Sequence, residues 1–214
     1  MTEQFEDQWS RSLTVHGLRA DEVRSVLQKS IRRGLVESAV KAAQELYESG
    51  PEAEEMLWRR LEIIAIEDVG LGMPEAPQLI EALNSQRLRR PRDIDRLMFS
   101  IHAARLLAEA PKDRTTMELA LWVGAEVEAG RTVEVFDFHV DQHTRRGVEL
   151  GRDTRFWWQA GGYGLENEIA PDGSPWTDDA RRVLGAPVGE APPAPDFTRP
   201  APADPVAAAL LDGE

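Results

Sequence analysis

The chain has 214 residues, a net charge of −13 and no cysteine, and 42% of its residues are hydrophobic. This length predicts one domain with a tail or two small domains, and the apolar fraction is sufficient for a buried core. The absence of cysteine excludes disulfides, thiolate catalysis and cysteine-based zinc sites. A protein this acidic gains nothing from its overall electric field when it approaches DNA, which argues against tight nonspecific binding to nucleic acid.

Targeting and nucleotide-binding motifs are missing from the sequence. No apolar run approaches the roughly 18 residues of a membrane-spanning helix, and the opening stretch MTEQFEDQWSRS lacks the basic and apolar regions of a signal peptide. Neither the Walker A pattern G-x-x-x-x-G-K-[ST] nor G-x-G-x-x-G occurs. These features predict a cytoplasmic protein that needs no cofactor and no membrane.

The first half of the chain is predicted to be helical. Apolar residues recur at helical spacing in residues 18–34 and 35–50, and each stretch ends at a glycine, so the two helices are expected to form a hairpin. After Pro51, a third helix is predicted from Glu52 to about Val69.

Three more helices are predicted in residues 75–88, 91–110 and 114–130, with prolines or glycines near their ends. Residues 132–151 are expected to start extended and to continue as a helix. Because sustained alternation of apolar and polar residues is scarce, the predicted fold is all-α, an orthogonal bundle of several helices.

The composition changes near Ile169. Nine of the 14 prolines follow it, and large apolar residues become sparse, so this segment cannot bury enough surface to offset the entropy of ordering it. The predicted organisation is an N-terminal extension (1–17), a helical domain (18–169) and a Pro/Ala-rich acidic tail (170–214) that is mostly disordered.

Two adjacent carboxylates, Glu67 and Asp68, end the apolar run of the third helix, where acidic side chains oppose the helix dipole. Helical spacing places both beside the apolar stripe, where an unpaired charge is costly. Adjacent carboxylates on a helix point about 100° apart, which suits two-acid catalysis poorly. We therefore expect a structural polar lock between helices, made of Lys29, Arg32, Arg60, Glu67 and Asp68.

Arginine clusters and a tryptophan pair are candidate contacts for nucleic acid or for a protein partner. Clustered basic side chains bind phosphates, and tryptophans stack on bases. The other interpretation is a solvated surface in which nearby acids neutralise the arginines and at least one tryptophan belongs to the core. The candidates are Arg33, Arg87, Arg89, Arg90, Arg92, Arg145, Arg146, Arg152, Trp157 and Trp158.

The segment DFHVDQH places His139 and His143 four residues apart, with Asp141 between them. On a helix the two histidines would share a face, which suits a metal ion. The pattern lacks the glutamate of H-E-x-x-H, and a further ligand would have to come from elsewhere in the chain. No metal is therefore predicted, and these three residues define an alternative, a metal-dependent enzyme.

The stretch LQKSIRRGLVESAVKAAQELYESG, followed by LWRRLEIIAIEDVGL, resembles the C-terminal helical region of the replication-associated recombination ATPases (RarA, also called MgsA). That region typically has a Lys-Ser-x-Arg helix, an alanine-rich helix and an Arg-Arg-Leu…Ala-Ser-Glu-Asp-Val-Gly element. HAARLLAEAPKDR resembles a later helix of the family, and HTRRGVELG…GGYGLENE matches its end loosely, so the resemblance covers approximately residues 18–168. The matching positions are Lys29, Ser30, Arg32, Arg59, Arg60, Leu61, Ala65, Glu67, Asp68, Val69 and Gly70.

The sequence also departs from this family. Ile66 stands where the family usually has serine, and no Walker A, Walker B or arginine-finger motif is present. The resemblance implies a clamp-loader-collar-like fold, a homo-oligomer (a tetramer in the family) and a partner in DNA replication or repair, without ATPase activity. The predicted function is a non-catalytic oligomerisation or adaptor domain. The alternatives are a nucleic-acid-binding module and the metal-dependent enzyme.

Overall fold

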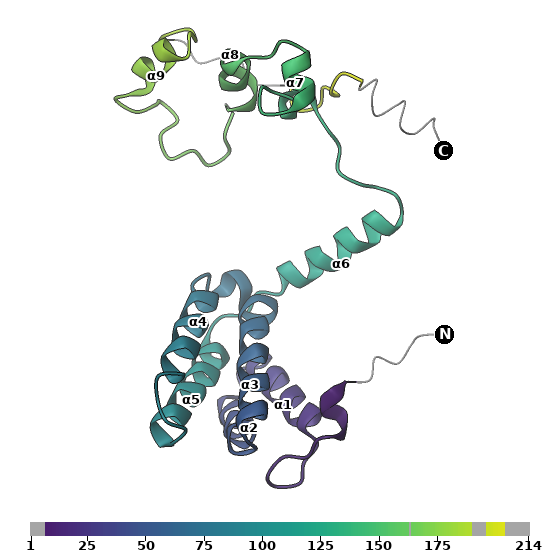
Figure 1. The fold of residues 1–214 in the computed structure, drawn as a ribbon, viewed down its shortest axis with the longest axis vertical. Helices are drawn as coiled ribbons and strands as arrows, with labels where there is room; N and C mark the ends of the chain where they lie inside the picture. Colours follow the sequence, from purple (N-terminus) through teal and green to yellow (C-terminus); the bar gives the residue numbers. More distant parts are fainter. Residues whose placement is uncertain (1–6, 163, 190–195, 204–214) are drawn as a thin grey trace. The chain divides into compact units, whose positions relative to one another are not determined.

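The chain is built from helices joined by loops, as a computed structural model shows (Figure 1). The structure describes residues 7–162, 164–189 and 196–203. Within these ranges there are two isolated β-bridges and no strand, so the prediction of an all-helical fold is confirmed. None of the helices in these ranges is both long enough and apolar enough to cross a membrane.

The chain divides into two compact units, unit 1 (residues 1–131) and unit 2 (residues 132–214). This boundary falls inside the segment 18–169 that the sequence analysis treats as one helical domain. The predicted helix 114–130 ends at this boundary, but the marked change in composition comes only near Ile169, where the domain was expected to end.

Unit 1 contains the longer α-helices and several short 3-10 and π-helical turns, and the α-helices follow the predicted order. They are η1 Gln8–Arg11, α1 Ala20–Arg32, α2 Val36–Glu48, α3 Pro51–Ile64, η2 Ala65–Val69, η3 Gly70–Gly72, α4 Ala76–Arg87, α5 Ile94–Glu109 and α6 Thr115–Glu128. The helix η1 lies within the predicted N-terminal extension, of which residues 1–6 lie outside the described residues.

The core of unit 1 lies among α1 to α5. Helix α2 packs most extensively against α1 and α5, because alanines on its inner side let the neighbouring helices approach closely. Larger side chains of α1 and α3 fill the remaining space. The core includes Leu27, Ile31, Ala39, Ala43, Leu46, Leu57, Trp58, Leu61, Ile64, Ile80 and Leu107.

Helix α3 changes its geometry near its C-terminal end. Its α-helical segment stops at Ile64, and the following residues form the wider π-helical turn η2. The helix predicted from Glu52 to about Val69 therefore has the expected extent, but its last turn is π-helical and not α-helical. The backbone N–H of Asp113 donates to the carbonyl oxygens of Asp68 and Val69, both at 3.2 Å, so a distant loop fixes the shape of this turn.

Gly70 allows that loop to approach. Its φ is +50°, a conformation that side chains disfavour. A Cβ atom at this position would lie 2.5 Å from the carbonyl oxygen of Asp113. The glycine after the two carboxylates is thus required by backbone conformation and by the close contact with Asp113.

Unit 2 is made of short helices: η4 Asp137–His139, α7 Arg145–Glu149, α8 Thr154–Phe156, η5 Trp157–Gly161 and α9 Thr177–Val183. In residues 132–151, where an extended start and then a helix were predicted, the α-helix is limited to α7. Helix α9 lies in the predicted tail, of which residues 190–195 and 204–214 lie outside the described residues.

Candidate functional site

Asp68 is the centre of a buried polar network that joins α1, η2 and the start of α6. Its side chain is fully buried. Gln28 Nε2 donates a hydrogen bond to Asp68 Oδ2 at 2.9 Å, Arg32 Nε donates to Oδ1, and Arg114 Nε lies 3.8 Å from Oδ1. These contacts compensate the buried negative charge, which would otherwise be strongly destabilising.

The other members of the predicted polar lock lie around Asp68 in different ways. Arg32 Nη2 is 3.2 Å from Glu67 Oε1, and its hydrogen bond to Asp68 raises the pKa of Arg32. Arg60 reaches the network through Gln28 Oε1, at 3.3 Å from its Nη1. Lys29 is exposed and makes no ion pair with a described residue, because its position on α1 turns the side chain towards solvent.

A second buried carboxylate, Glu54 of α3, was missed by the sequence analysis. Arg87 Nη1 and Arg96 Nε lie 2.9 and 2.7 Å from Glu54 Oε1, and Arg92 Nε lies 3.2 Å from Oε2. Arg87 is itself buried, and its guanidinium stacks on the ring of Trp58 at 5.3 Å. One carboxylate therefore holds three arginines from α4, α5 and the loop between them.

The sequence contains a signal for this role of Glu54. Glu54 stands three, four and seven residues before Leu57, Trp58 and Leu61, so it shares a helix row with the core. A carboxylate on such a row needs cationic partners. The arginine-rich stretch RLRRPRDIDR supplies them.

The proposed role of this arginine cluster in nucleic-acid contact needs correction. Arg87 is buried and fully paired, so it is unavailable to a ligand. Arg92 is paired with Glu54 and lies over the Tyr47 ring at 4.5 Å. Arg89 and Arg90 are exposed, as is Arg33 at the end of α1.

The arginine candidates of unit 2 differ in how far the fold occupies them. Arg152 Nη1 donates to the carbonyl oxygen of Asp137 at 2.8 Å, its Nη2 pairs with the Asp137 carboxylate, and its guanidinium lies 4.1 Å from the Phe156 ring centre. Arg145 pairs with Glu149 at 2.8 Å, and Arg146 is half-buried. Arg152 therefore stabilises the fold of unit 2 and cannot be counted as a free surface cation.

Trp157 and Trp158 are both half-buried and meet edge to face, with ring centres 5.9 Å apart. Trp157 also contacts the His143 ring in the same geometry. Contacts of this kind are typical of a small aromatic core. They leave less ring surface for stacking on bases than the sequence analysis allowed.

The histidine candidates do not share a helix face. The helix η4 ends at His139, and a turn separates it from α7. His139 Nδ1 accepts a hydrogen bond from the Phe136 N–H at 3.0 Å, and His143 Nδ1 lies 3.1 Å from Asp141 Oδ1. Within the ranges that the structure describes, no group of three His, Cys, Asp or Glu side chains is arranged to hold a metal ion.

Helix α6 differs from the other long helices of unit 1, because none of its side chains is buried. In Figure 1 it extends away from the bundle, with its first turn near η2. Leucine, tryptophan and valine occupy several sides of it, so solvent faces a mostly apolar helix. The exposed large side chains are Leu119, Leu121, Trp122, Val123 and Val127.

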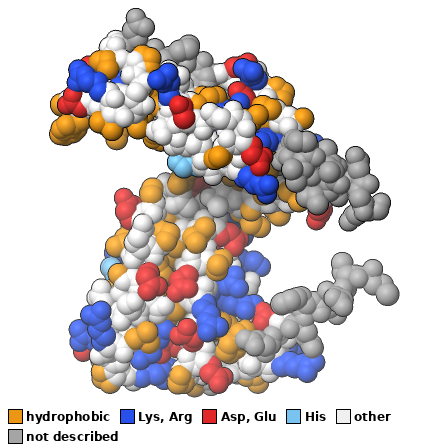
Figure 2. All heavy atoms as spheres, turned by 45° about the horizontal axis from the view of Figure 1, so that its top comes forward, with side chains coloured by type: hydrophobic (Ala, Val, Ile, Leu, Met, Phe, Trp, Pro, Cys, Tyr) orange, Lys and Arg blue, Asp and Glu red, His pale blue; other side chains and the backbone are white. Residues whose placement is uncertain are grey.

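The remaining surface has a mixed charge distribution. On the face that Figure 2 shows, acidic and basic side chains are interspersed, with hydrophobic side chains between them. Such a distribution leaves no large patch of one sign on that face, although the chain as a whole carries a net charge of −13. The apolar surface of α6 is therefore a more distinctive feature than any charged patch on that face.

Within the residues that the structure describes, fold and site together define an all-helical protein with buried ion networks and an exposed apolar helix, α6. No family model matches the chain. Over 133 residues, which are 61% of the chain, it is 31% identical to "Replication-associated recombination protein A" of Bacillus subtilis (strain 168). The match spans 30% of that relative's length, so the similarity concerns one part of it.

Proposed function

We propose that this chain is a non-catalytic helical oligomerisation and adaptor module that works with proteins of DNA replication or recombination. The similarity to part of the Bacillus subtilis protein supports a role connected with replication or recombination. The exposed apolar helix α6 is the observation that carries the proposal, because it provides the surface for self-association.

An isolated helix of this length is only marginally stable in water. Helix α6 has 14 residues and buries none of them in the described structure. An exposed apolar patch of this kind is typical of an interaction site. A partner that covers α6 therefore adds both apolar burial and helix stability.

A second copy of this chain is the partner that α6 fits best. In an antiparallel pair of α6 helices, Arg114 at the start of one helix would lie near Glu128 at the end of the other, since Arg114 is partly exposed beside Asp68 whereas Glu126 already pairs with Arg131. The helix dipoles then also run in opposite directions. Such a pairing is isologous, so by itself it gives a dimer. The tetramer implied by the resemblance to the RarA family would need a further interface between two such dimers.

Sedimentation velocity of the full chain tests this proposal. The wild-type protein is expected as a discrete oligomer at micromolar concentration. Trp122→Glu places a charge on the exposed surface of α6 and is expected to give a monomer, whose far-ultraviolet circular dichroism spectrum loses at most the helical signal of α6 because no partner stabilises that helix. The control Leu88→Glu changes an exposed leucine outside α6 and should leave the oligomer intact. A wild-type monomer at 100-fold higher concentration contradicts the proposal.

The adaptor role and the absence of catalysis need separate tests. Affinity purification of the chain from its host, with and without nuclease, should recover replication or recombination proteins that persist after nuclease treatment. Loss of all such proteins with nuclease contradicts a protein adaptor. Purified protein is expected not to hydrolyse ATP, and turnover that co-purifies with the chain contradicts the non-catalytic assignment.

A further inference from the structure

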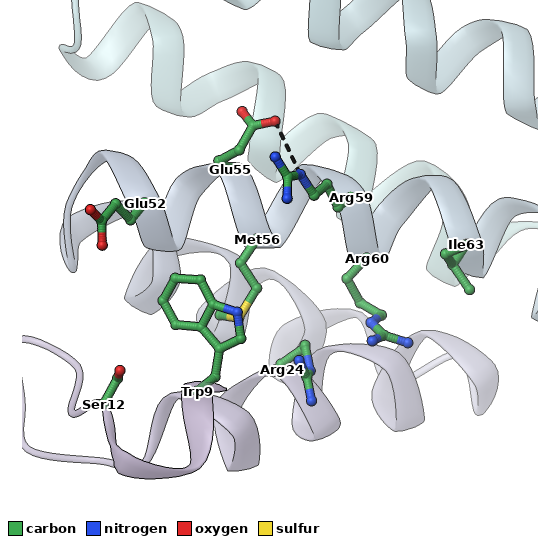
Figure 3. A pocket seen from close by; sticks show the side chains of 9 residues that line it. All are labelled: Trp9, Ser12, Arg24, Glu52, Glu55, Met56, Arg59, Arg60 and Ile63. Atoms are coloured by element: carbon green, nitrogen blue, oxygen red, sulfur yellow. Dashed lines mark ion pairs between the residues drawn. The ribbon is translucent and has the colours of Figure 1, made fainter. Parts of the chain in front are cut away.

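A pocket of about 640 Å³ lies between the N-terminal segment, α1 and α3 of unit 1. This volume falls within the roughly 300–1,000 Å³ of small-molecule sites. Figure 3 shows the side chains that line it. They are Trp9, Ser12, Arg24, Glu52, Glu55, Met56, Arg59, Arg60 and Ile63.

The two ends of the pocket carry opposite charges. Glu52, Met56 and Arg60 are four residues apart along α3, so one helix row runs from an acid through an apolar side chain to a cation. In Figure 3, Glu52 lies at one end and Arg60 lies at the other, where Arg24 of α1 joins it. The Trp9 ring lies between these ends, beside Met56.

Arg60 lacks a carboxylate partner in the described structure. Its guanidinium donates to the amide oxygen of Gln28 at 3.3 Å, whereas the nearby Arg24 pairs with Asp7. Burial lowers the pKa of Arg60 and the positive charge of Arg24 lowers it further, while the negative charges of Glu67, Asp7 and Asp68 act in the opposite direction without cancelling the shift. A partly buried cation beside a second cation is unfavourable, and a bound anion would relieve this repulsion.

The Trp9 ring and the acidic end restrict the kind of anion. A bare inorganic ion would use only the arginine end. A ligand that fills the pocket needs an anionic group, a flat ring for the indole and a hydrogen-bond donor for Glu52. A nucleotide has all three: its phosphate, its base, and its sugar hydroxyl or base amino group.

We propose that this pocket binds one nucleotide, with the phosphate between Arg24 and Arg60, the base against Trp9 and a donor group towards Glu52. The nucleotide is either free or part of a single strand, because bases in a duplex are already stacked on each other. This site lies on α1 and α3 and is independent of the self-association proposed for α6.

Isothermal titration calorimetry at low salt tests the site in the full chain. The probes are deoxyadenosine monophosphate, an eight-residue deoxyadenosine oligonucleotide and inorganic phosphate. We expect saturable binding of at least one nucleotide probe, with inorganic phosphate weaker. Arg60→Gln and Trp9→Leu should each weaken nucleotide binding at least tenfold. Arg105→Gln, which changes an exposed arginine on α5, should have no effect.

Two further readouts separate binding from folding. Because Arg60→Gln removes a hydrogen bond to Gln28 and no ion pair within the described residues, it should unfold within about 5 °C of the wild type, and it should sediment as the wild type does. Trp9→Leu should leave the affinity for inorganic phosphate unchanged, since the indole contacts the base. If Arg60→Gln is less stable than this, the test of the site rests on Trp9→Leu, which should bind nucleotide more weakly and inorganic phosphate as the wild type does.

The result also identifies the source of the nucleotide. If the protein binds the monophosphate as tightly as it binds each site on the oligonucleotide, the natural ligand is a free nucleotide. If it binds the oligonucleotide alone, the natural ligand is a single strand. Absence of saturable binding by both nucleotide probes, or equal affinity of the wild type and Trp9→Leu, overturns the proposal. Neither result bears on the oligomeric state.

Discussion

Arg87 of α4 and Glu54 of α3 are both almost completely buried, and their charged groups meet at 2.9 Å in unit 1. Arg96 and Arg92 contact the same carboxylate, so three positive charges surround one negative charge. Glu55 compensates part of the excess by accepting from Arg87 Nη2 at 2.8 Å. This network ties α3 to α4 and to the start of α5.

Glu54→Gln should destabilise unit 1 by about 3–5 kcal/mol, because a neutral amide replaces the carboxylate shared by the buried Arg87 and the partly buried Arg92 and Arg96, and Glu55 compensates only Arg87. Urea denaturation of the full chain, followed by circular dichroism, measures the change. Glu37→Gln is the matched control, since Glu37 is 91% exposed and pairs only with Lys41. A cost below about 1 kcal/mol would show that the arginines find other partners.

Asp68→Asn should also cost about 3–5 kcal/mol, because it leaves the Arg32 guanidinium without its buried partner. Glu67→Gln should cost less than about 1 kcal/mol, since Glu67 remains partly in contact with water. The same urea titration compares both variants with the wild type. Equal effects of the two substitutions would contradict the central position of Asp68.

Gly70→Ala should destabilise unit 1 by about 2–4 kcal/mol, because it adds both a strained φ and a collision with the Asp113 backbone. Gly34→Ala has a positive φ of 70° but no close contact, so it should cost only about 1–2 kcal/mol. Thermal unfolding of the two variants separates the cost of the strained φ from the cost of the collision with the Asp113 backbone. A Gly70→Ala protein as stable as the Gly34→Ala protein would show that the loop at Asp113 moves freely.

The His16 side chain provides a prediction about pH. His16 Nδ1 lies 2.6 Å from Glu45 Oε2, and this hydrogen bond raises the pKa of His16 above its ordinary value of 6.5. The charged pair therefore stabilises the fold below pH 6.5, and its contribution is lost as the pH rises through the raised pKa. NMR titration of the imidazole should show that Glu45→Gln lowers the pKa of His16. Glu37→Gln on the same helix should leave it unchanged.

Much of unit 1 is predictable because its helices have regular apolar spacing and end at glycine or proline. The same spacing places Asp68 on a row with Leu57, Leu61 and Ile64, and this position explains why its charge needs partners. Arg32 is a natural partner because it lies near the apolar row of its own helix.

Other features depend on contacts between residues that are far apart in sequence. The π-helical turn is held by Asp113, more than 40 positions after Asp68, and local propensity contains no information about that contact. Lys29 and Arg32 differ in exposure because of their positions around α1, which composition alone does not resolve. The arginines around Glu54 look like a surface cluster until the helices that carry them are packed together.

Asp113 links the turn after α3 to the first turn of α6. Its carboxylate accepts from the Leu71 N–H at 3.2 Å and from the Thr115 N–H at 3.0 Å, while Arg114 beside it reaches Asp68. The N-terminal end of α6 is thus linked, through Asp113 and Arg114, to the buried polar network of unit 1. A partner that immobilises α6 is therefore expected to slow hydrogen exchange at the Asp113 amide. Conversely, opening of the turn at Asp113 is expected to lower the affinity of α6 for that partner. Both effects follow because partner binding and turn opening are coupled by one and the same free energy.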